Sequence, residues 1–428
     1  MKYLLAIWDG GGATLPNLGI ARLLVGRGHE VVVYGDLTLA ADVVGTGAIY
    51  RTWPTAPQRV STAPEDDVLK DWECRTPIGA VLRLRDRLIA GPSARFAADV
   101  AAALDDEPFD AVLADGILLG ALVGAEARGI PAAALVGSVY IAPSRVRPPA
   151  GGIQPAKGPW GRARDRVGFG LVNLLWRGGL RNLNNARTEH GLGPIDHLWN
   201  QWDRADRVLM LTGSAFDDPP PDAPNVRYVG PVLEDIPATG RPKLPPGKDP
   251  LVVVGLSSSY MDQSDLLIRI AQALSSIPVR GVITTGPAVD PVDVPAAANV
   301  VVVRTAAHTE LISQADLVVT HAGHGTLIKA IAAGVPTLCL PLGRDQHDNA
   351  ARAARHGVGL VLSARSDADT IADAIGHMFH EPSFRAAAAA LGEQIWAEIV
   401  SGALMEELED LPQARNSPEA GGRESAWR

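Results

Sequence analysis

The sequence predicts an α/β protein made of two halves, each a parallel sheet flanked by helices. Three observations support this: 428 residues exceed one ordinary core, short β-branched runs alternate with helical segments in both halves, and a proline-rich stretch separates them. The expected parts are a Rossmann-like domain at 1–215, a linker at 216–250, a second Rossmann-like domain at 251–385, a helical segment at 386–411 and a disordered tail at 412–428.

The composition limits the kind of protein. Hydrophobic residues make up 46% and charged residues 20%, which is typical of a soluble globular chain. A net charge of −9 argues against nucleic acid as the main partner. Two distant cysteines, Cys74 and Cys339, favour a reducing cytoplasm over a disulfide framework. The first residues read as a strand and not as a signal peptide, and no apolar run suits stable membrane insertion.

The N-terminal half opens as a parallel βαβ unit. A strand at 2–8 leads into the loop at 9–14, Pro16 opens a helix that ends at 27–29, and the next strand covers 31–34. A dinucleotide-binding opening is the competing interpretation. However, the three glycines at 10–12 lack the G-x-G-x-x-G spacing, so Asp36 after the second strand supports that interpretation only weakly.

Strand and helix patterns continue to residue 212, interrupted by two segments rich in prolines or arginines. Helices are expected at 92–104 and 121–127, and strands at 109–113, 132–135 and 207–212. The arginine-rich segment at 160–185 carries Trp160, Phe169, Leu171, Leu175 and Trp176. These side chains suit the wall of a pocket for an apolar ring-containing ligand, the domain core, or contact with anionic lipid, and the sequence leaves all three open.

The second half is organised around two consecutive strand–turn–helix units at 316–362, which read DLVVTHAGHGTLIKAIAAGVPTLCLPLGRDQHDNAARAARHGVGLVL. The first strand covers 317–320 and the second 335–340. A small-residue turn that feeds a helix gathers free N–H groups at the positive end of the helix dipole, which is a site for an anion and most often for phosphate.

Polar side chains surround both turns. His321 and His324 flank the first turn, and Thr326 adds a hydroxyl in the first helical turn. Asp345 and Gln346 follow the second strand and supply a carboxylate and an amide that suit sugar hydroxyls. The pair of turns therefore predicts a diphosphate at the first and a hexose at the second.

At these residues the chain resembles a known family. HAGHGT followed by AAGVPTLCLPLGRDQHDNAAR is similar to the donor-site signature of nucleotide-sugar-dependent GT-B glycosyltransferases, in particular the bacterial natural-product type of the UDP-glycosyltransferase superfamily. The resemblance implies the GT-B fold, in which the domain at 1–215 binds the acceptor, the domain at 251–385 binds the donor and one long helix at 386–411 crosses back to the first domain. It also implies a UDP- or TDP-hexose as co-substrate, no cofactor and no metal. The donor-binding positions that it implies are Ser257, His308, His321, Gly323, His324, Gly325, Thr326, Asp345, Gln346 and Asn349. Thr305 stands where many relatives stack a tryptophan on the base, so the nucleobase stays open.

The acceptor-side loop departs from the family pattern. This loop carries Asp9, Gly12, Ala13 and Thr14, and Ala13 stands where relatives have the catalytic histidine. Asp115 matches the aspartate that orients this histidine in relatives, so Asp115 is the candidate base, directly or through water. An acceptor acidic enough to need no base, a role for Asp115 as a helix cap or buried acid, and a homologue that no longer transfers sugar all remain open.

The expected function is inverting, metal-independent transfer of a hexose to a hydroxyl of a small lipophilic acceptor such as a macrolide, polyketide or phenol. An inactive donor-binding partner protein and a lipid or sterol glycosyltransferase are the alternatives. The Asp367–Asp369 pair resembles a metal-binding D-x-D but is predicted to cap the following helix. The oligomeric state, monomer or homodimer, is open.

Overall fold

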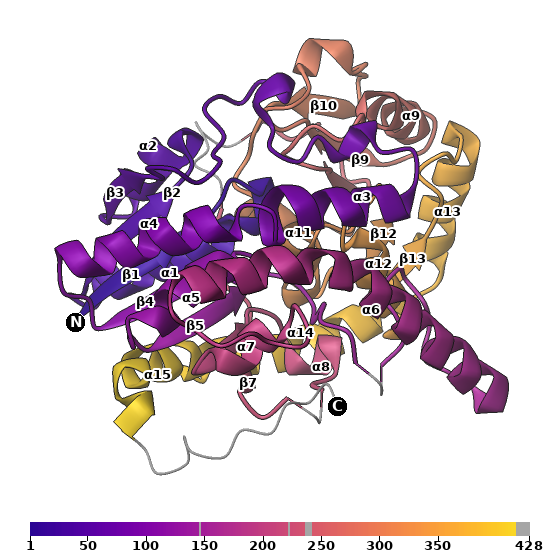
Figure 1. Ribbon diagram of the computed structural model, residues 1–428. Helices are drawn as coiled ribbons and strands as arrows, with labels where there is room; N and C mark the ends of the chain where they lie inside the picture. The colour runs from indigo at the N-terminus through magenta and orange to yellow at the C-terminus, as the bar shows by residue number, and fades with distance from the viewer. Residues whose placement is uncertain (145–146, 221–222, 236–241, 417–428) are drawn as a thin grey trace.

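The computed structural model describes residues 1–144, 147–220, 223–235 and 242–416. Two parallel sheets with helices on both faces form two lobes that lie one beside the other (Figure 1). This confirms the predicted fold class. Part of the predicted linker (236–241) and most of the predicted tail (417–428) lie outside the described residues.

The first sheet has seven parallel strands in the order β3-β2-β1-β4-β5-β6-β7. Its strands are β1 (Lys2–Ala6), β2 (Glu30–Gly35), β3 (Ile49–Thr52), β4 (Ala111–Asp115), β5 (Ala132–Val136), β6 (Arg207–Met210) and β7 (Val226–Tyr228). The strand order changes direction between β1 and β4, so the loops that follow these two strands diverge and leave a crevice at their carboxyl ends. The loop at 9–14 and Asp115 both lie at this point.

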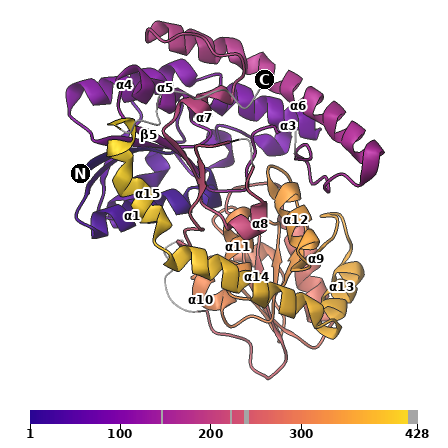
Figure 2. The ribbon, with the colours of Figure 1, turned by 90° about the horizontal axis from the view of Figure 1, so that it is seen from below.

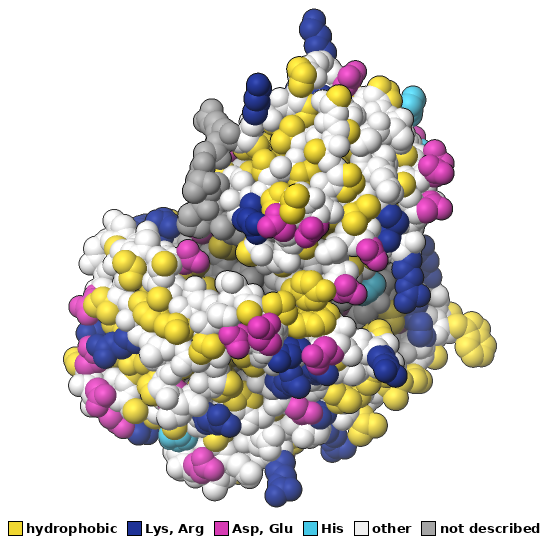
Figure 3. Space-filling model, turned by 90° about the horizontal axis from the view of Figure 1, so that it is seen from above, with side chains coloured by type: hydrophobic (Ala, Val, Ile, Leu, Met, Phe, Trp, Pro, Cys, Tyr) yellow, Lys and Arg dark blue, Asp and Glu magenta, His cyan; other side chains and the backbone are white. Residues whose placement is uncertain are grey.

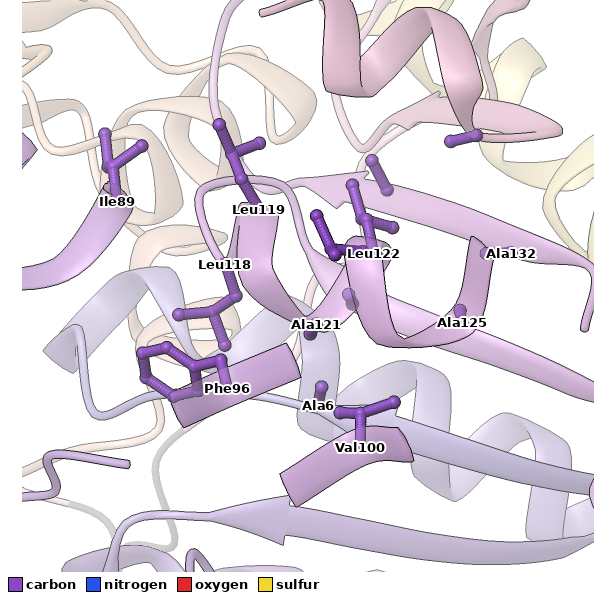
Figure 4. Packing of buried hydrophobic residues seen from close by; sticks show 14 of the residues in the cluster. Ala6, Ile89, Phe96, Val100, Leu118, Leu119, Ala121, Leu122, Ala125 and Ala132 are labelled. Carbon is purple, nitrogen blue, oxygen red and sulfur yellow. The ribbon is translucent and has the colours of Figure 1, made fainter. Parts of the chain in front are cut away.

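Helices cover both faces of this sheet. They are α1 (Leu15–Gly26), α2 (Ala40–Gly45), α3 (Pro77–Leu84), α4 (Ser93–Asp106), α5 (Leu119–Ala127), α6 (Gly158–Glu189), α7 (Asn200–Arg204) and α8 (Ser214–Asp217). Figure 4 shows Phe96 and Val100 of α4 beside Leu119 and Leu122 around α5. Gly120 lets the two helices approach closely, because a Cβ there would lie 2.3 Å from the Ser93 carbonyl oxygen. Each large apolar side chain buried in such a core contributes about 1.5–3 kcal/mol.

The second sheet has six parallel strands in the order β10-β9-β8-β11-β12-β13. Its strands are β8 (Leu251–Gly255), β9 (Arg280–Thr284), β10 (Val300–Val303), β11 (Leu317–Thr320), β12 (Thr337–Cys339) and β13 (Gly359–Val361). The helices that flank it are α9 (Ser264–Ser275), α10 (His308–Ile312), α11 (His324–Ala332), α12 (Gln346–Arg355) and α13 (Ala368–His380). β8 and β11 are central and buried on both faces, as their valine-rich sequences predict. Asp367 accepts a hydrogen bond from the Thr370 N–H at 2.9 Å, which confirms that it caps α13.

Two helices return the chain to the first lobe (Figure 2). α14 (Ser383–Val400) packs against α11 in the second lobe, and its Glu398 accepts from the Ser214 N–H of the first lobe at 3.0 Å. α15 (Ala403–Asp410) then packs on the first lobe, where the Leu408 carbonyl accepts from Tyr3 Oη at 3.0 Å. The sequence predicted one continuous crossing helix. The chain instead breaks at Gly402, whose φ of +81° ends the helical path.

The division between the lobes also differs from the predicted one. β7 belongs to the first sheet although residues 226–228 lie inside the segment predicted as linker. We therefore propose that the connection between the domains begins after Tyr228 and ends at Leu251, where β8 starts. Among the helices that the structure describes, none combines the length and the apolar composition needed to cross a bilayer.

A buried carboxylate links the two lobes. Asp217 of α8 is fully buried and accepts from the Tyr140 N–H at 2.6 Å, from Tyr228 Oη at 2.7 Å, and from Arg147 Nη2 at 2.5 Å. Arg352 of α12, in the second lobe, donates its Nε–H to the same carboxylate at 2.8 Å. Asp217 therefore neutralises two guanidinium groups and connects the two lobes.

Replacing Asp217 by asparagine should lower the free energy of unfolding by about 3–5 kcal/mol, since it leaves two largely buried arginines without their counter-charge. Urea unfolding followed by tryptophan fluorescence measures this. Asp218→Asn is the matched control, because Asp218 is 63% exposed and pairs with Arg355 at the surface. The control should change stability by less than about 0.5 kcal/mol. Equal effects of the two substitutions would contradict the stabilising role of the buried network.

Candidate active site

The turn between β11 and α11 forms the candidate phosphate site. Ala322 adopts a left-handed φ of +64°, which is unusual for a residue with a side chain and is often found at functional sites. A Cβ on Gly323 would lie 2.5 Å from His321 Nε2, so only glycine fits beside this imidazole. In the described part of the chain, no side chain caps the start of α11. The helix therefore presents its first N–H groups at this turn, as the sequence predicted.

His321 is buried and neutral. Burial lowers its pKa to about 4, and this outweighs the nearby carboxylate of Asp345, which acts in the opposite direction. Its Nδ1 is buried and has no hydrogen-bond partner among the described residues. An uncharged imidazole with an unused nitrogen can bind a phosphate oxygen through its N–H group without adding a charge.

His324 lies at the lobe interface. It is the first residue of α11, and its Nε2 lies 2.9 Å from Thr212 Oγ1 of the first lobe. Burial lowers the pKa of His324, so it too is neutral at pH 7. The structure therefore gives His324 a bridging contact. Its direct contact with a donor stays a prediction, as do those of Gly325 and Thr326, which follow it in the first turn of α11.

The second turn precedes α12 and holds Asp345 and Gln346. The carboxylate of Asp345 accepts from Ser138 Oγ of the first lobe and from Asn349 Nδ2 at 2.9 Å. Gln346 Oε1 accepts from the N–H groups of Leu342 and Gly343 at 2.8 and 2.9 Å. The amide oxygen of Gln346 therefore holds its own turn. Its Nε2 donates to Met261 Sδ at 3.3 Å, which leaves one N–H of the amide for a sugar hydroxyl, and that contact stays a prediction.

Asn349 connects the two turns. Its Nδ2 donates to the Ala322 carbonyl at 3.0 Å, and its Oδ1 is buried with no partner among the described residues. The resemblance predicted a donor contact for Asn349, and that contact stays a prediction. In the structure the N-cap of α12 is Asp345, and Asn349 instead braces the first turn from inside the helix.

Ser257 and His308 complete the predicted donor residues. Ser257 follows β8, and its Oγ lies 3.1 Å from Ser259 Oγ. His308 Nε2 lies 2.9 Å from Thr284 Oγ1, so this histidine bonds to the protein instead of facing solvent. Burial lowers the pKa of His308 to about 4. Ser257 follows the central strand β8 and His308 follows the edge strand β10, so both lie at the carboxyl end of the sheet, which also carries the two turns.

The acceptor-side loop of the first lobe lies directly over the donor turns. A Cβ on Gly11 would meet Ser258 Oγ at 2.8 Å, and a Cβ on Gly325 would lie 3.7 Å from the Gly12 carbonyl oxygen. Gly11, Gly12 and Ala13 form the short helix η1 (Gly11–Ala13), which packs against α11. The loop that carries Ala13 therefore faces the candidate phosphate site.

Two polar residues of this loop are engaged in holding it. Thr14 Oγ1 accepts from the Gly10 N–H at 3.0 Å and donates to the Trp8 carbonyl at 2.9 Å. Asp9 accepts from Thr38 Oγ1 at 2.7 Å and from Arg59 Nη1 at 3.5 Å. Asp9 and Thr14 therefore hold the loop in place, and neither is a better candidate for the base than Asp115.

Asp115 has the environment of a candidate base. It lies at the end of β4 and is buried, and its Oδ2 accepts from Asn17 Nδ2 at 3.0 Å. Burial raises its pKa to about 6, although hydrogen bonds from the Ile117 N–H and from Asn17 act in the opposite direction. A carboxylate with a pKa near the working pH is a better proton acceptor than an ordinary aspartate. The N-cap of α5 is Leu118, so Asp115 is not the cap of that helix, and its burial and hydrogen bonds fit a base and a structural buried acid alike.

A pocket lies beside the crevice, between the segment after β5, α6 and α12. Its cavity volume is only about 40 Å³, and its lining includes Tyr140, Pro149, Phe169, Val172 and Arg352. Figure 3 shows the surface hollowed where the two lobes meet. The aromatic residues of the arginine-rich segment thus have different roles: Phe169 lines the pocket, Trp176 packs edge to face on Trp199, and Trp160 is 88% exposed.

Sequence reasoning missed the residues that support the candidate site from a distance. Asn17 is the polar side chain in an otherwise apolar stretch of α1, a pattern that could have indicated a buried contact. Ser138, two residues after β5, follows a strand end in the same way as the predicted site residues. Arg344 forms an ion pair with Asp71 of the first lobe, and no local sequence pattern indicates this pairing.

Known proteins resemble this chain over nearly its full length. Residues 290–398 match the glycosyltransferase family 28 C-terminal domain. The 4'-demethylrebeccamycin synthase of Lentzea aerocolonigenes is 31% identical over 406 residues, which cover 92% of this chain and 95% of the relative.

Solved structures show the same fold. The glycotransferase of kitacinnamycin has a TM-score of 0.73 at 21% identity and is matched over 95% of this chain and 98% of its own. The spinosyn rhamnosyltransferase SpnG complexed with thymidine diphosphate has a TM-score of 0.68 at 19% identity, over 96% of this chain and 100% of its own. Together with the sequence relative, these matches identify the chain as an enzyme that belongs to the nucleotide-sugar-dependent GT-B glycosyltransferases of the UDP-glycosyltransferase superfamily, of the bacterial natural-product type.

Proposed function

We propose that the protein transfers a hexose from a UDP- or TDP-sugar to a hydroxyl group of a small lipophilic acceptor, with inversion at the anomeric carbon and without a metal ion. One observation carries the donor half of this proposal. The uncapped start of α11 and the imidazole of His321, whose Nε2 would lie 2.5 Å from a Cβ on Gly323, meet at one turn, directly beneath the loop that faces it from the first lobe. That arrangement suits a diphosphate.

The proposed roles follow from the placement of each group. The N–H groups at the start of α11 and the imidazole of His321 bind the diphosphate and stabilise the charge that develops on it as the bond to the sugar breaks. Asp345 and the NH₂ group of Gln346 bind sugar hydroxyls. Ser257 and His308 lie on the same side of the sheet and serve the phosphates and the nucleoside.

The acceptor half of the proposal rests on Asp115 and the pocket. The acceptor hydroxyl attacks the anomeric carbon from the side opposite the diphosphate, and Asp115 takes its proton directly or through one water. A raised pKa near 6 suits this role. The pocket with Phe169 and Val172 offers apolar contacts to the ring system of the acceptor.

Ala13 favours a second candidate function, a homologue that binds the donor but transfers no sugar. Alanine offers no base at the position where relatives have histidine, so transfer depends on Asp115 or on an acidic acceptor. Such a protein would bind nucleotides and act as the partner of an active transferase. A third candidate, transfer to a lipid or sterol, would use the same donor turns.

Product analysis separates these candidates. The protein is incubated with UDP-glucose or TDP-glucose and a panel of phenols, macrolide aglycones and a sterol, with and without EDTA, and products are sought by mass spectrometry as a hexose increment. TDP-sugars are tested first because a structural neighbour is described with thymidine diphosphate bound. Transfer to phenols or macrolides that EDTA leaves unchanged, with an inverted anomeric centre by NMR, supports the proposal. Nucleotide binding without any product would favour the inactive homologue.

A further inference from the structure

An arginine of the donor lobe reaches across the candidate phosphate site to the first lobe. Arg344 lies in the turn before α12, and its guanidinium donates to Asp71 of the short helix η4 (Asp71–Glu73) at 2.5 Å and 3.2 Å. Its Nη1 also donates to Ser259 Oγ at 3.3 Å, and Ser259 Oγ lies 3.1 Å from Ser257 Oγ. Arg344 therefore joins the turn after β8 to the turn after β12.

The histidines of the donor turns carry no positive charge, so the charge that neutralises a bound diphosphate has to come from another side chain. His321 and His324 are neutral at pH 7, because burial lowers the pKa of each. The three basic side chains of α11 and α12 bind carboxylates outside these turns: Lys329 binds Asp235, Arg352 binds Asp217 and Arg355 binds Asp218. A diphosphate brings at least two negative charges, and the helix dipole supplies only a partial positive charge.

Arg344 is accessible to a ligand. Its side chain is 23% exposed, and its backbone adopts a left-handed φ of +53°, which is uncommon for arginine. Beside it, Trp72 of the same short helix packs edge to face on Tyr260 at 5.3 Å between ring centroids. The segment of the first lobe that carries Asp71 is thus docked on the donor lobe, next to the serines of the turn after β8.

We propose that Arg344 binds the diphosphate of the donor and supplies its neutralising charge, and that Asp71 is a counter-ion which competes with the diphosphate for this guanidinium. The inference rests on the proposed function, which places the diphosphate at these turns. A planar guanidinium with several N–H donors can bind phosphate oxygens in pairs, so arginine suits this role better than lysine. Binding of the donor would then draw Arg344 away from Asp71 and weaken one contact between the lobes.

The two partners should therefore change affinity in opposite directions. By isothermal titration calorimetry with UDP and TDP, Arg344→Met should weaken binding about 10- to 100-fold. Asp71→Asn should strengthen it about 3- to 10-fold, because it removes a competing charge. The matching nucleoside, which carries no phosphate, should bind the unaltered protein and both variants equally.

Controls separate a phosphate contact from a structural effect. Arg355→Met, at the end of the helix α12 that follows Arg344, should leave the affinity for UDP and TDP unchanged, and Arg344→Lys should restore part of the lost affinity. Arg344→Met with unchanged diphosphate affinity, or with equal losses for nucleoside and diphosphate, would overturn this inference and leave the proposed function standing. If the unaltered protein binds neither UDP, TDP nor GDP, both the proposed function and the inference fail.

Discussion

Asp115→Asn should lower kcat by about 10²–10⁴-fold, the usual contribution of a general base. Asparagine keeps the size of the side chain and an oxygen that can accept from Asn17, so the buried site is preserved. The nucleotide affinity should stay unchanged, because Asp115 lies in the first lobe and the donor turns lie in the second. Steady-state kinetics with a phenol acceptor, beside calorimetry with UDP or TDP, measure both quantities.

The pH profile tests the same role independently. Burial raises the pKa of Asp115 to about 6, and a base acts only when it is unprotonated. The active fraction therefore rises with pH through about 6, and kcat/KM should fall on the acid side of that value. In Asp115→Asn the residual activity should lose this acid limb, because asparagine does not titrate.

Asp36 is the necessary control for that profile. Burial raises its pKa to about 7, and its carboxylate accepts from the Asp9 N–H at 2.8 Å near the same loop. Asp36→Asn should retain the acid limb near 6 if Asp115 is the base. Loss of the limb in Asp36→Asn, or unchanged turnover in Asp115→Asn, would remove Asp115 from the mechanism and point to an acceptor that needs no base.

Local sequence patterns were sufficient for the fold and for the donor turns. Valine-rich runs, glycine-rich turns and helix caps act within a few residues, so β2, β11 and the turn at His321 follow from the order of the residues. The start of α11 and the cap at Asp367 depend on such short-range contacts and lie where they were predicted.

The contacts between the lobes could not be predicted in this way. Asp71 and Arg344 are 273 residues apart, and Asp217 and Arg352 are 135 apart. Each pair forms only because two independently folded sheets meet, and a charged residue on a loop gives no sign of which distant charge it will bind. The bridge between Thr212 and His324 has the same origin.

The aromatic residues at 160–185 illustrate a second limit. The sequence could not show which aromatic side chains line a pocket and which pack in the core, because Phe169 and Trp176 are both aromatic residues of the same arginine-rich segment. Phe169 faces the pocket and Trp176 packs on Trp199, so both interpretations hold for different residues of one helix. Which face of α6 meets which neighbour depends on the position of the whole helix.

His321→Ala should lower kcat about 10²- to 10³-fold and weaken the binding of UDP and TDP about 10- to 100-fold. The substitution removes a buried donor beside the start of α11, at the point where charge develops on the leaving diphosphate. Alanine removes both ring nitrogens: Nδ1 has no partner among the described residues, whereas the ring also bonds to the backbone of Gly255, so part of the loss falls on stability. Calorimetry, steady-state kinetics and a thermal unfolding midpoint measure the three effects.

Two further variants show whether this loss comes from a lost donor. His321→Gln keeps an N–H group at a similar reach and should recover part of kcat, whereas alanine recovers none. His380→Ala, in α13, removes a histidine whose Nδ1 bonds to the Gly376 carbonyl of the same helix, and it should change neither kcat nor affinity. If His321→Ala keeps full nucleotide affinity and turnover, the diphosphate does not bind at the start of α11. The assignment of the donor turns would then be wrong even though the fold stands.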